Sequence, residues 1–127
     1  MLGRERRIRS PDQAIAAGMG YVGEDRQAGL VPRMSVAANI TLASLGKVSR
    51  GPLLRFGDER AEADRVVEAL GIRTASIDTT VDALSGGNQQ KVVLARWSCA
   101  GARVLLLDDP TRGIDVGAKE EVFRLVR

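Results

Sequence analysis

The sequence predicts an α/β protein in which a helical lobe is inserted into a core of parallel strands. Residues 104–107 are apolar at every position, which is typical of a central parallel strand covered on both faces. Between about residues 35 and 100, helical patterns follow one another and no strand is expected among them. With 127 residues, 44% of them hydrophobic, the chain is long enough for one domain with its own core.

Two elements are predicted before residue 34, a helix and a short strand. Ser10 can cap the helix, and Pro11 fits its first turn, where the missing N–H is not needed. Gly18 then ends it. The helix is expected at residues 12–17 and the strand at 19–23. Before them, residues 7–9 could be the end of a further strand.

Four more helices are predicted, each opened by a polar residue that can cap its first turn. Residues 46–57 and 72–83, which lie between them, are expected to be irregular. The last helix is expected to turn Val122, Phe123 and Val126 inward. The four predicted caps are Ser35, Asp58, Ser85 and Asp115, and the helices are expected to end near residues 45, 70, 100 and 127.

Composition excludes several classes of function. The chain has no His and one cysteine, Cys99, so Ser-His or Cys-His catalysis and an intrachain disulfide are ruled out. Cys99 is expected to pack in the core of a cytosolic protein. The net charge of +3 comes from residues 1–9, and only one Trp, one Tyr and two Phe are present. No nucleic-acid surface is therefore expected, and neither a signal peptide nor a membrane-spanning apolar run is visible.

Ser85-Gly86-Gly87 has the composition of an anion-binding helix start. The first turn of a helix has unpaired N–H groups and a partial positive charge, and glycines let a phosphate come close to the backbone. Each glycine costs about 1 kcal/mol relative to alanine inside a helix, so two of them need a reason. A plain serine cap followed by a flexible entry is the alternative that these residues alone leave open.

Asp108 and Asp109 directly follow the apolar strand. A hydrophobic strand that ends in an acid is how phosphate-transfer proteins hold Mg²⁺, usually through water. Asp108 is the candidate for the metal side, and Asp109 could polarise an attacking water. Alternatively, the two acids only cap the next turn. Glu24-Asp25-Arg26 after the first strand has the same two interpretations, a ligand-facing group or a solvated turn.

Taken together, these features resemble the ATP-binding cassette (ABC) transporter ATPase family, which has a P-loop NTPase fold. The resemblance extends over residues 8–127. It is carried by Leu-Ser-Gly-Gly-x-x-Gln, then an apolar strand ending in Asp-acid-Pro-Thr, then Gly-Ile-Asp. The segments 24–26, 84–91 and 111–119 are similar to the sugar-importer branch (ribose, galactose or xylose type). In that branch one polypeptide carries two tandem cassettes, and this chain looks most like a part of the second.

The resemblance implies that one end of the predicted helix after residue 85 contacts nucleotide. That end would be the ABC signature, which meets the γ-phosphate of ATP bound by the opposite cassette of a head-to-tail dimer. The residues implied in this contact are Ser85, Gly86, Gly87 and Gln89.

Other roles follow from the resemblance in the same way. Asp108 would be the Walker B aspartate that holds Mg²⁺ through water, and Asp109 would stand at the catalytic position. Asp115 would belong to the D-loop across the dimer interface. Glu24 would be Q-loop-like, near the surface that meets the membrane subunit.

Three departures from the family pattern are visible. The sequence contains no G-x-x-x-x-G-K-[ST] phosphate loop and no histidine for the switch position. Asp109 replaces the usual catalytic Glu, and a reach shorter by about 1.5 Å can cost on the order of 100-fold in rate. The chain is therefore expected to be a partial cassette, truncated at both ends, without the Walker A region and the C-terminal strands. Its incomplete sheet is expected to expose backbone edges and apolar faces.

The implied regions are a remnant of the β core (residues 1–34), the helical lobe with the signature (35–102), and the Walker B strand with the D-loop and its helix (103–127). The implied function is the ATP-hydrolysing subunit of a sugar importer, peripheral on the cytoplasmic face of the membrane, with the fragment alone inactive. Its partners would be a second cassette, a membrane permease and, indirectly, a periplasmic sugar-binding protein. The alternative is a non-catalytic module that lends its signature face to a partner cassette or docks on the membrane subunit. A DNA-repair or translation ATPase is a weaker third possibility.

Overall fold

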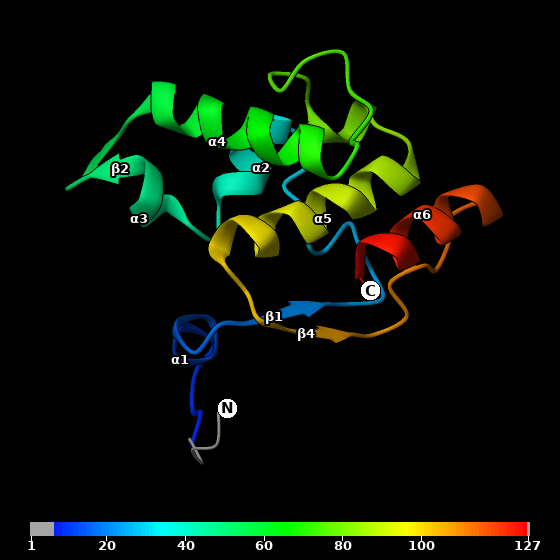
Figure 1. The fold of residues 1–127 in the computed structure, drawn as a ribbon, viewed down its shortest axis with the longest axis horizontal. Coiled ribbons are helices and arrows are strands. Elements are labelled where there is room, and N and C mark those ends of the chain that lie inside the picture. Colours follow the sequence, from blue (N-terminus) through cyan, green and yellow to red (C-terminus); the bar gives the residue numbers. More distant parts are fainter. Residues whose placement is uncertain (1–6, 127) are drawn as a thin grey trace.

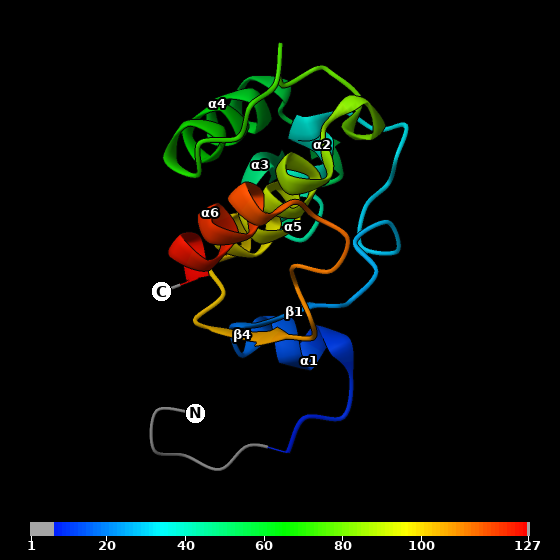
Figure 2. The ribbon, with the colours of Figure 1, turned by 90° about the vertical axis from the view of Figure 1, so that its right-hand side faces the viewer.

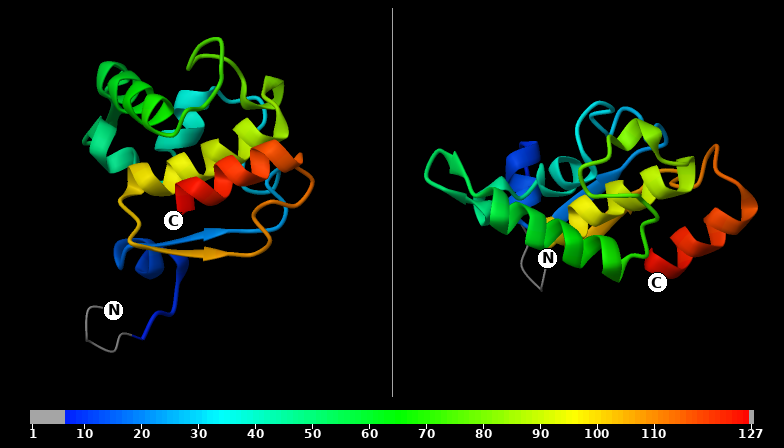
Figure 3. Two further views of the ribbon diagram at one scale, coloured as in Figure 1. Left: turned by 45° about the vertical axis from the view of Figure 1, so that its right-hand side comes forward. Right: turned by 90° about the horizontal axis from the view of Figure 1, so that it is seen from above.

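A computed structural model describes residues 7–126, in which helices cover one face of a two-stranded parallel sheet (Figure 1). The strands β1 (Met19–Val22) and β4 (Val104–Leu107) pair in parallel, with Met19 opposite Val104 and Val22 opposite Leu107. Two helices, α5 (Gly86–Ala100) and α6 (Val116–Val126), lie side by side over these strands (Figure 3). The predicted α/β arrangement is confirmed.

The N-terminal helix and strand lie close to their predicted positions. Helix α1 (Pro11–Ala16) starts after Ser10, whose hydroxyl accepts a hydrogen bond from the backbone N–H of Gln13. Gly18 ends it with φ +80°, a left-handed value that glycine adopts without strain. The predicted strand end at residues 7–9 is wrong, since these residues form no strand. Among the residues described, β1 pairs only with β4. Residues 1–6, with most of the basic start, and Arg127 lie outside the described part.

The helical lobe lies on the far side of α5 and α6 from the sheet (Figure 2). It contains α2 (Val36–Thr41), α3 (Leu45–Val48), α4 (Phe56–Ala69) and the short 3₁₀ helix η1 (Val81–Ala83). Helices α2, α4 and α5 pack on one another. The predicted cap at Ser35 is confirmed, since its hydroxyl accepts a hydrogen bond from the N–H of Ala38 at 3.1 Å.

The prediction of a strand-free lobe is wrong. The expected loop at 46–57 contains α3 and a small antiparallel hairpin, β2 (Ser49–Arg50) with β3 (Leu53–Leu54). Gly51 sits in the hairpin turn with φ +60°, the kind of backbone that such tight turns require.

The predicted cap of α4 at Asp58 is also wrong. Helix α4 begins at Phe56, with Arg55 in the cap position and no side-chain hydrogen bond to the first turn. Asp58 instead lies inside that turn, where its carboxylate pairs with Arg55 at 3.0 Å. A negative charge in the first turn also complements the positive end of the helix.

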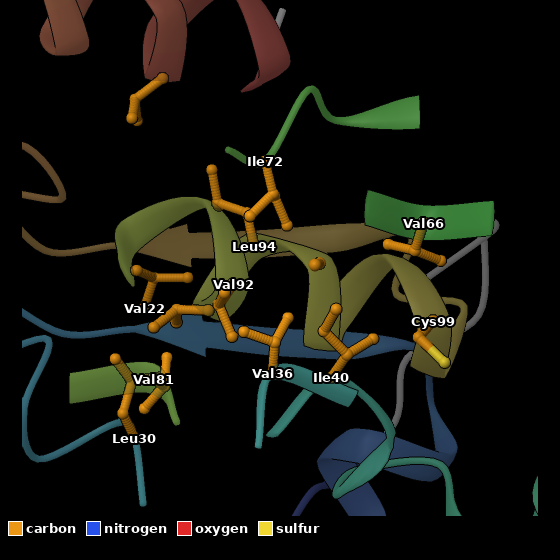
Figure 4. Close-up of a cluster of buried hydrophobic side chains, with 13 residues drawn as sticks. Val22, Leu30, Val36, Ile40, Val66, Ile72, Val81, Val92, Leu94 and Cys99 are labelled. Carbon is orange, nitrogen blue, oxygen red and sulfur yellow. The ribbon is translucent and has the colours of Figure 1, made fainter. Parts of the chain in front are cut away.

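The main core fills the space between the lobe, α5 and the upper face of the sheet (Figure 4). Val22 reaches it from β1, Val36 and Ile40 from α2, and Val66 from α4. Cys99 of α5 is buried in the same cluster, as predicted. Figure 4 shows these side chains pointing toward one another around α5, which makes α5 the central element of the fold.

The prediction that strand 104–107 is covered on both faces is wrong for the described chain. Leu105 and Leu107 pack toward the core, whereas Val104 and Leu106 are 38% and 50% exposed on the other face. Helices α5 and α6 cover the core-facing side of this sheet, and α1 lies only near its amino end on the other side, so alternate residues remain in solvent, as expected of an incomplete sheet (Figure 1). Phe123 of α6, predicted to turn inward, is also 47% exposed, although its neighbour Val122 is fully buried.

Candidate functional site

The carboxyl ends of β1 and β4 lie at the same edge of the sheet, and acidic residues follow both strands. Asp108 continues the strand pairing, since its N–H donates to the carbonyl of Val22 at 2.9 Å. Its carboxylate accepts a hydrogen bond from the Tyr21 hydroxyl at 3.2 Å, and this bond raises the pKa of Tyr21. A cavity of about 460 Å³ opens here and is lined by Tyr21, Glu24, Arg26, Arg96, Trp97 and Asp108, among others. Parallel strands commonly present ligand-facing groups at such an edge.

Asp109 lies in a tight turn directly after this edge. Its φ is +39°, in the left-handed region that aspartate tolerates better than most non-glycine residues. Its carbonyl accepts a hydrogen bond from the N–H of Arg112 at 3.2 Å, which closes the turn. Both Asp108 and Asp109 are exposed.

The acidic edge fits magnesium only in the way that phosphate-transfer sites do. Residues 7–126 contain no group of three or more His, Cys, Asp or Glu side chains placed to hold a metal ion. Mg²⁺ is usually held by one or two carboxylates together with water and substrate phosphates, rather than by an all-protein cage. The exposed carboxylate of Asp108 satisfies that requirement.

Ser85 caps helix α5, as predicted. Its hydroxyl accepts a weak hydrogen bond from the backbone N–H of Asn88 at 3.5 Å and a shorter one from the Asn88 side chain at 2.9 Å. The first-turn amides of Gly86 and Gly87 precede the first intrahelical hydrogen bond, so they remain available to an acceptor. Ser85 is exposed and Gly87 is buried.

The two glycines have a packing reason that the sequence did not reveal. A Cβ on Gly87 would lie 2.6 Å from the Cβ of Ala118, so the close approach of α5 to α6 requires glycine. A Cβ on Gly86 would lie 2.9 Å from the guanidinium of Arg26. Tight helix packing therefore explains Gly87, whereas at Gly86 the nearest atoms belong to the end of the flexible Arg26 side chain.

Asp115 lies beside this helix start. Its carboxylate caps α6 by accepting a hydrogen bond from the N–H of Ala118 at 2.9 Å. A hollow of about 230 Å³ is lined by Ser85, Gly87, Asn88 and Asp115, among others. The structure thus brings Ser85 and Gly87 together with Asp115, whereas Asp108 and Glu24 line the other cavity.

Gln89 and Glu24 are both engaged within the chain. The Gln89 side-chain amide donates to the carbonyl of Val81 and accepts from Arg26, each at 3.2 Å. Glu24 forms an ion pair with Arg112. Each group of the Gln89 amide still has one unused donor or acceptor site, so Gln89 can contact a ligand while it keeps both bonds.

An ion pair that no sequence pattern had predicted links α5 and α6. The side chain of Lys91 is only 6% exposed and donates to the carboxylate of Glu121 at 2.6 Å and to the carbonyl of Gly71 at 2.9 Å. Arg73 approaches the same carboxylate at 3.4 Å. A lysine directly before the apolar run 92–95 was the available signal, since a buried lysine needs a partner.

Glu121 gives the fold a predictable response to acid. The hydrogen bond from Lys91 lowers the pKa of the Glu121 carboxyl in the folded protein. Its contribution to stability is therefore present above the unfolded pKa and is lost as the pH falls through the lower folded value. Glu121→Gln is expected to lower stability near neutral pH and to flatten the loss below about pH 4.5. Urea unfolding between about pH 6 and about pH 3 measures this.

Glu120→Gln is the matched control for that prediction, because Glu120 is the neighbouring residue on α6. Its contact with Arg124 is exposed on both sides and 3.5 Å long. This variant should keep the acid response of the wild type. Equal pH profiles for the two variants would contradict a role for the Lys91–Glu121 pair.

Comparison with known proteins identifies the family. Residues 3–112 match the model described as ABC transporter. The chain belongs to the ABC transporter family. It is 54% identical over 125 residues to the ribose import ATP-binding protein RbsA 3 of Rubrobacter xylanophilus. That match covers 98% of this chain and 25% of the relative. An Agrobacterium fabrum protein named for ribose, galactose and methyl galactoside import is 52% identical over 126 residues, with 98% and 25% covered.

The chain thus spans about a quarter of the length of these relatives. Among solved structures, the dimeric ATP-binding cassette MJ0796 in a post-hydrolysis state with ADP and Pi matches with a TM-score of 0.68. It is 22% identical, and the match covers 92% of this chain and 50% of the cassette. This likeness confirms the expected ABC-type, P-loop NTPase fold. No helix among residues 7–126 has both the length and the hydrophobicity that a membrane crossing needs.

Proposed function

We propose that the chain is part of the ATP-binding subunit of a sugar importer and uses ATP hydrolysis to drive carbohydrate uptake. The names of its ribose-import and galactose-import relatives support this assignment. The observation that carries it is the start of α5, where the exposed Ser85 cap and Gly87 border the same hollow as Asp115. Such a helix start favours a phosphate through its free amides and its partial positive charge.

Ser85, Gly86 and Gly87 would act on ATP held by a second, head-to-tail cassette. Asp108 lines a different cavity, which supports a second nucleotide site there. Asp109, the next residue along the chain, would serve that same nucleotide. The hydroxyl and the two amides are donors fixed in place before the reaction, which suits them to charge that develops on the phosphate. Asp115 would lie at the interface between the two cassettes.

The acidic edge would supply the metal and water contacts of that second site. Asp108 would hold Mg²⁺ through water, with the Tyr21 hydroxyl fixing one of its carboxylate oxygens. Bound Mg²⁺ would neutralise phosphate charge. Asp109 would orient the attacking water and accept hydrogen bonds from it. Glu24 would lie near the membrane subunit, and the sugar-binding protein would contact the importer elsewhere, outside the cytoplasm.

The test is transport by the protein assembled with its membrane subunit in vesicles. Mg-ATP hydrolysis and uptake of labelled ribose or galactose should rise together when a sugar-binding protein is supplied. Asp108→Asn should abolish both. ATP hydrolysis without uptake of any pentose or hexose would contradict the sugar assignment.

A non-catalytic role is the second candidate, and the backbone of Asp109 favours it. The carboxylate is one methylene shorter than the usual Glu and sits on a left-handed residue. In this case the chain would only lend its signature face to a partner cassette. Wild-type turnover that is unaffected by Asp109→Asn but lost with Ser85→Glu would support this role.

A further inference from the structure

Arg26 joins the two parts of the site that the proposed function assigns to different nucleotides. It belongs to the loop that leads from β1 to the helical lobe. Its Nε donates to the Gln89 side chain on α5 at 3.2 Å, and one terminal nitrogen donates to the carbonyl of Arg112 at 3.2 Å. One side chain thus reaches both the signature helix and the turn after β4.

Gly86 makes room for the Arg26 guanidinium. A Cβ on Gly86 would lie 2.9 Å from its other terminal nitrogen and 3.1 Å from its central carbon. Gly113 also lies beside the guanidinium, where a Cβ would be in ordinary contact at 3.5 Å. The guanidinium therefore lies between the first turn of α5 and the turn that leads to Asp115.

Glu24 strengthens the same connection. Its carboxylate pairs with the side chain of Arg112, whose backbone carbonyl accepts from Arg26. Glu24 and Arg26 of the triplet thus both contact Arg112 in the turn. This gives the triplet a role inside the chain that the sequence did not indicate.

We propose that Arg26 is a positioning residue that fixes the start of α5 relative to the 109–115 turn and thereby couples the two nucleotide sites. This inference rests on the proposed function for its effect on ATP turnover. The two hydrogen bonds need the several N–H donors of a guanidinium, because their acceptors, Gln89 and Arg112, lie on different elements. Lysine offers a single ammonium and cannot serve both acceptors in the same geometry.

The first test is hydrogen exchange on the full-length protein, which needs no ATPase activity. Arg26→Gln should raise amide exchange several-fold in both 86–89 and 109–115 and leave the core of α4 unchanged. Arg26→Lys should give the same pattern. Arg33→Gln, at an exposed arginine on the same loop, should leave both segments at wild-type exchange. An effect confined to one segment, or a wild-type pattern in Arg26→Lys, would overturn the proposal.

Gly86→Ala provides a second approach if Arg26→Gln loosens the whole fold. The added methyl on α5 would push the Arg26 guanidinium out of its place, so amide exchange should again rise in both 86–89 and 109–115. A rise limited to 86–89 would show that the bridge does not connect them.

The second test is the ATP kinetics of the assembled importer. Arg26→Gln should lower kcat about 10-fold, a typical size for coupling between sites, with little change in KM. A change in KM alone would contradict a positioning role. If the wild-type assembly hydrolyses no ATP, the proposed function fails, while the exchange experiment still decides whether Arg26 links the two segments.

Discussion

Replacing Gly87 with alanine is expected to lower ATP turnover on the order of 100-fold and stability by about 1–3 kcal/mol. The new Cβ would lie 2.6 Å from the Cβ of Ala118, so α5 and α6 would have to move apart by about 1 Å or more to reach ordinary contact distance. Such a shift would carry Ser85 away from Asp115. Steady-state hydrolysis by the assembled protein and urea unfolding measure the two effects.

A compensating variant separates packing from phosphate contact. Gly87→Ala combined with Ala118→Gly removes the clashing methyl and should restore stability. If Gly87 serves only the helix contact, turnover should return as well; if the phosphate also needs the bare backbone, turnover should stay low. Gly57→Ala is the control, since nothing lies within 4 Å of its Cβ position in α4. Unchanged turnover in Gly87→Ala would contradict the importance of the close contact between Gly87 and Ala118. An equal loss of turnover in Gly57→Ala would show that the effect is not specific to that contact.

Replacing Asp109 with glutamate is expected to raise ATP turnover, by up to about 100-fold, because the longer side chain recovers about 1.5 Å of reach. The same change should cost roughly 1 kcal/mol in stability, since φ is +39° and glutamate tolerates left-handed backbone less well than aspartate. Turnover at saturating Mg-ATP and the urea midpoint measure the two effects.

Asp109→Asn is the matched control for that prediction. It keeps the side-chain length and tolerates the left-handed backbone, but it removes the charge. Turnover should fall well below the wild type. If the glutamate variant gains nothing and the asparagine variant loses nothing, Asp109 does not act on water.

Helices were predictable where neighbouring residues include a polar side chain that can cap the first turn or a glycine that can end the last one. Ser10, Ser35, Ser85 and Asp115 all cap their helices through side-chain hydrogen bonds. The hairpin at 49–54 was missed because its two-residue strands are too short to show any periodicity. The cap at Asp58 was wrong because an acid inside a first turn looks, in sequence, like an acid at the cap.

The site was only partly predictable, because its distances depend on contacts between distant segments. Asp108 and Glu24 were each predicted to follow a strand, but their place in one cavity depends on the parallel pairing of β1 with β4. The close approach of Gly87 to Ala118, however, depends on how α6 packs against α5. The link from Arg26 to Arg112 spans 86 positions, and no local pattern indicates such a contact.

The central claim is that Ser85 and Asp109 act on different nucleotides, and single-turnover hydrolysis tests it most directly. Ser85→Glu and Asp109→Asn are introduced separately and then together into one cassette of the assembled importer. Each single variant should disable one of the two sites and leave about half of the wild-type amplitude, and the double variant should leave almost none. A double variant with the same amplitude as either single variant would place both residues at one nucleotide and contradict the claim.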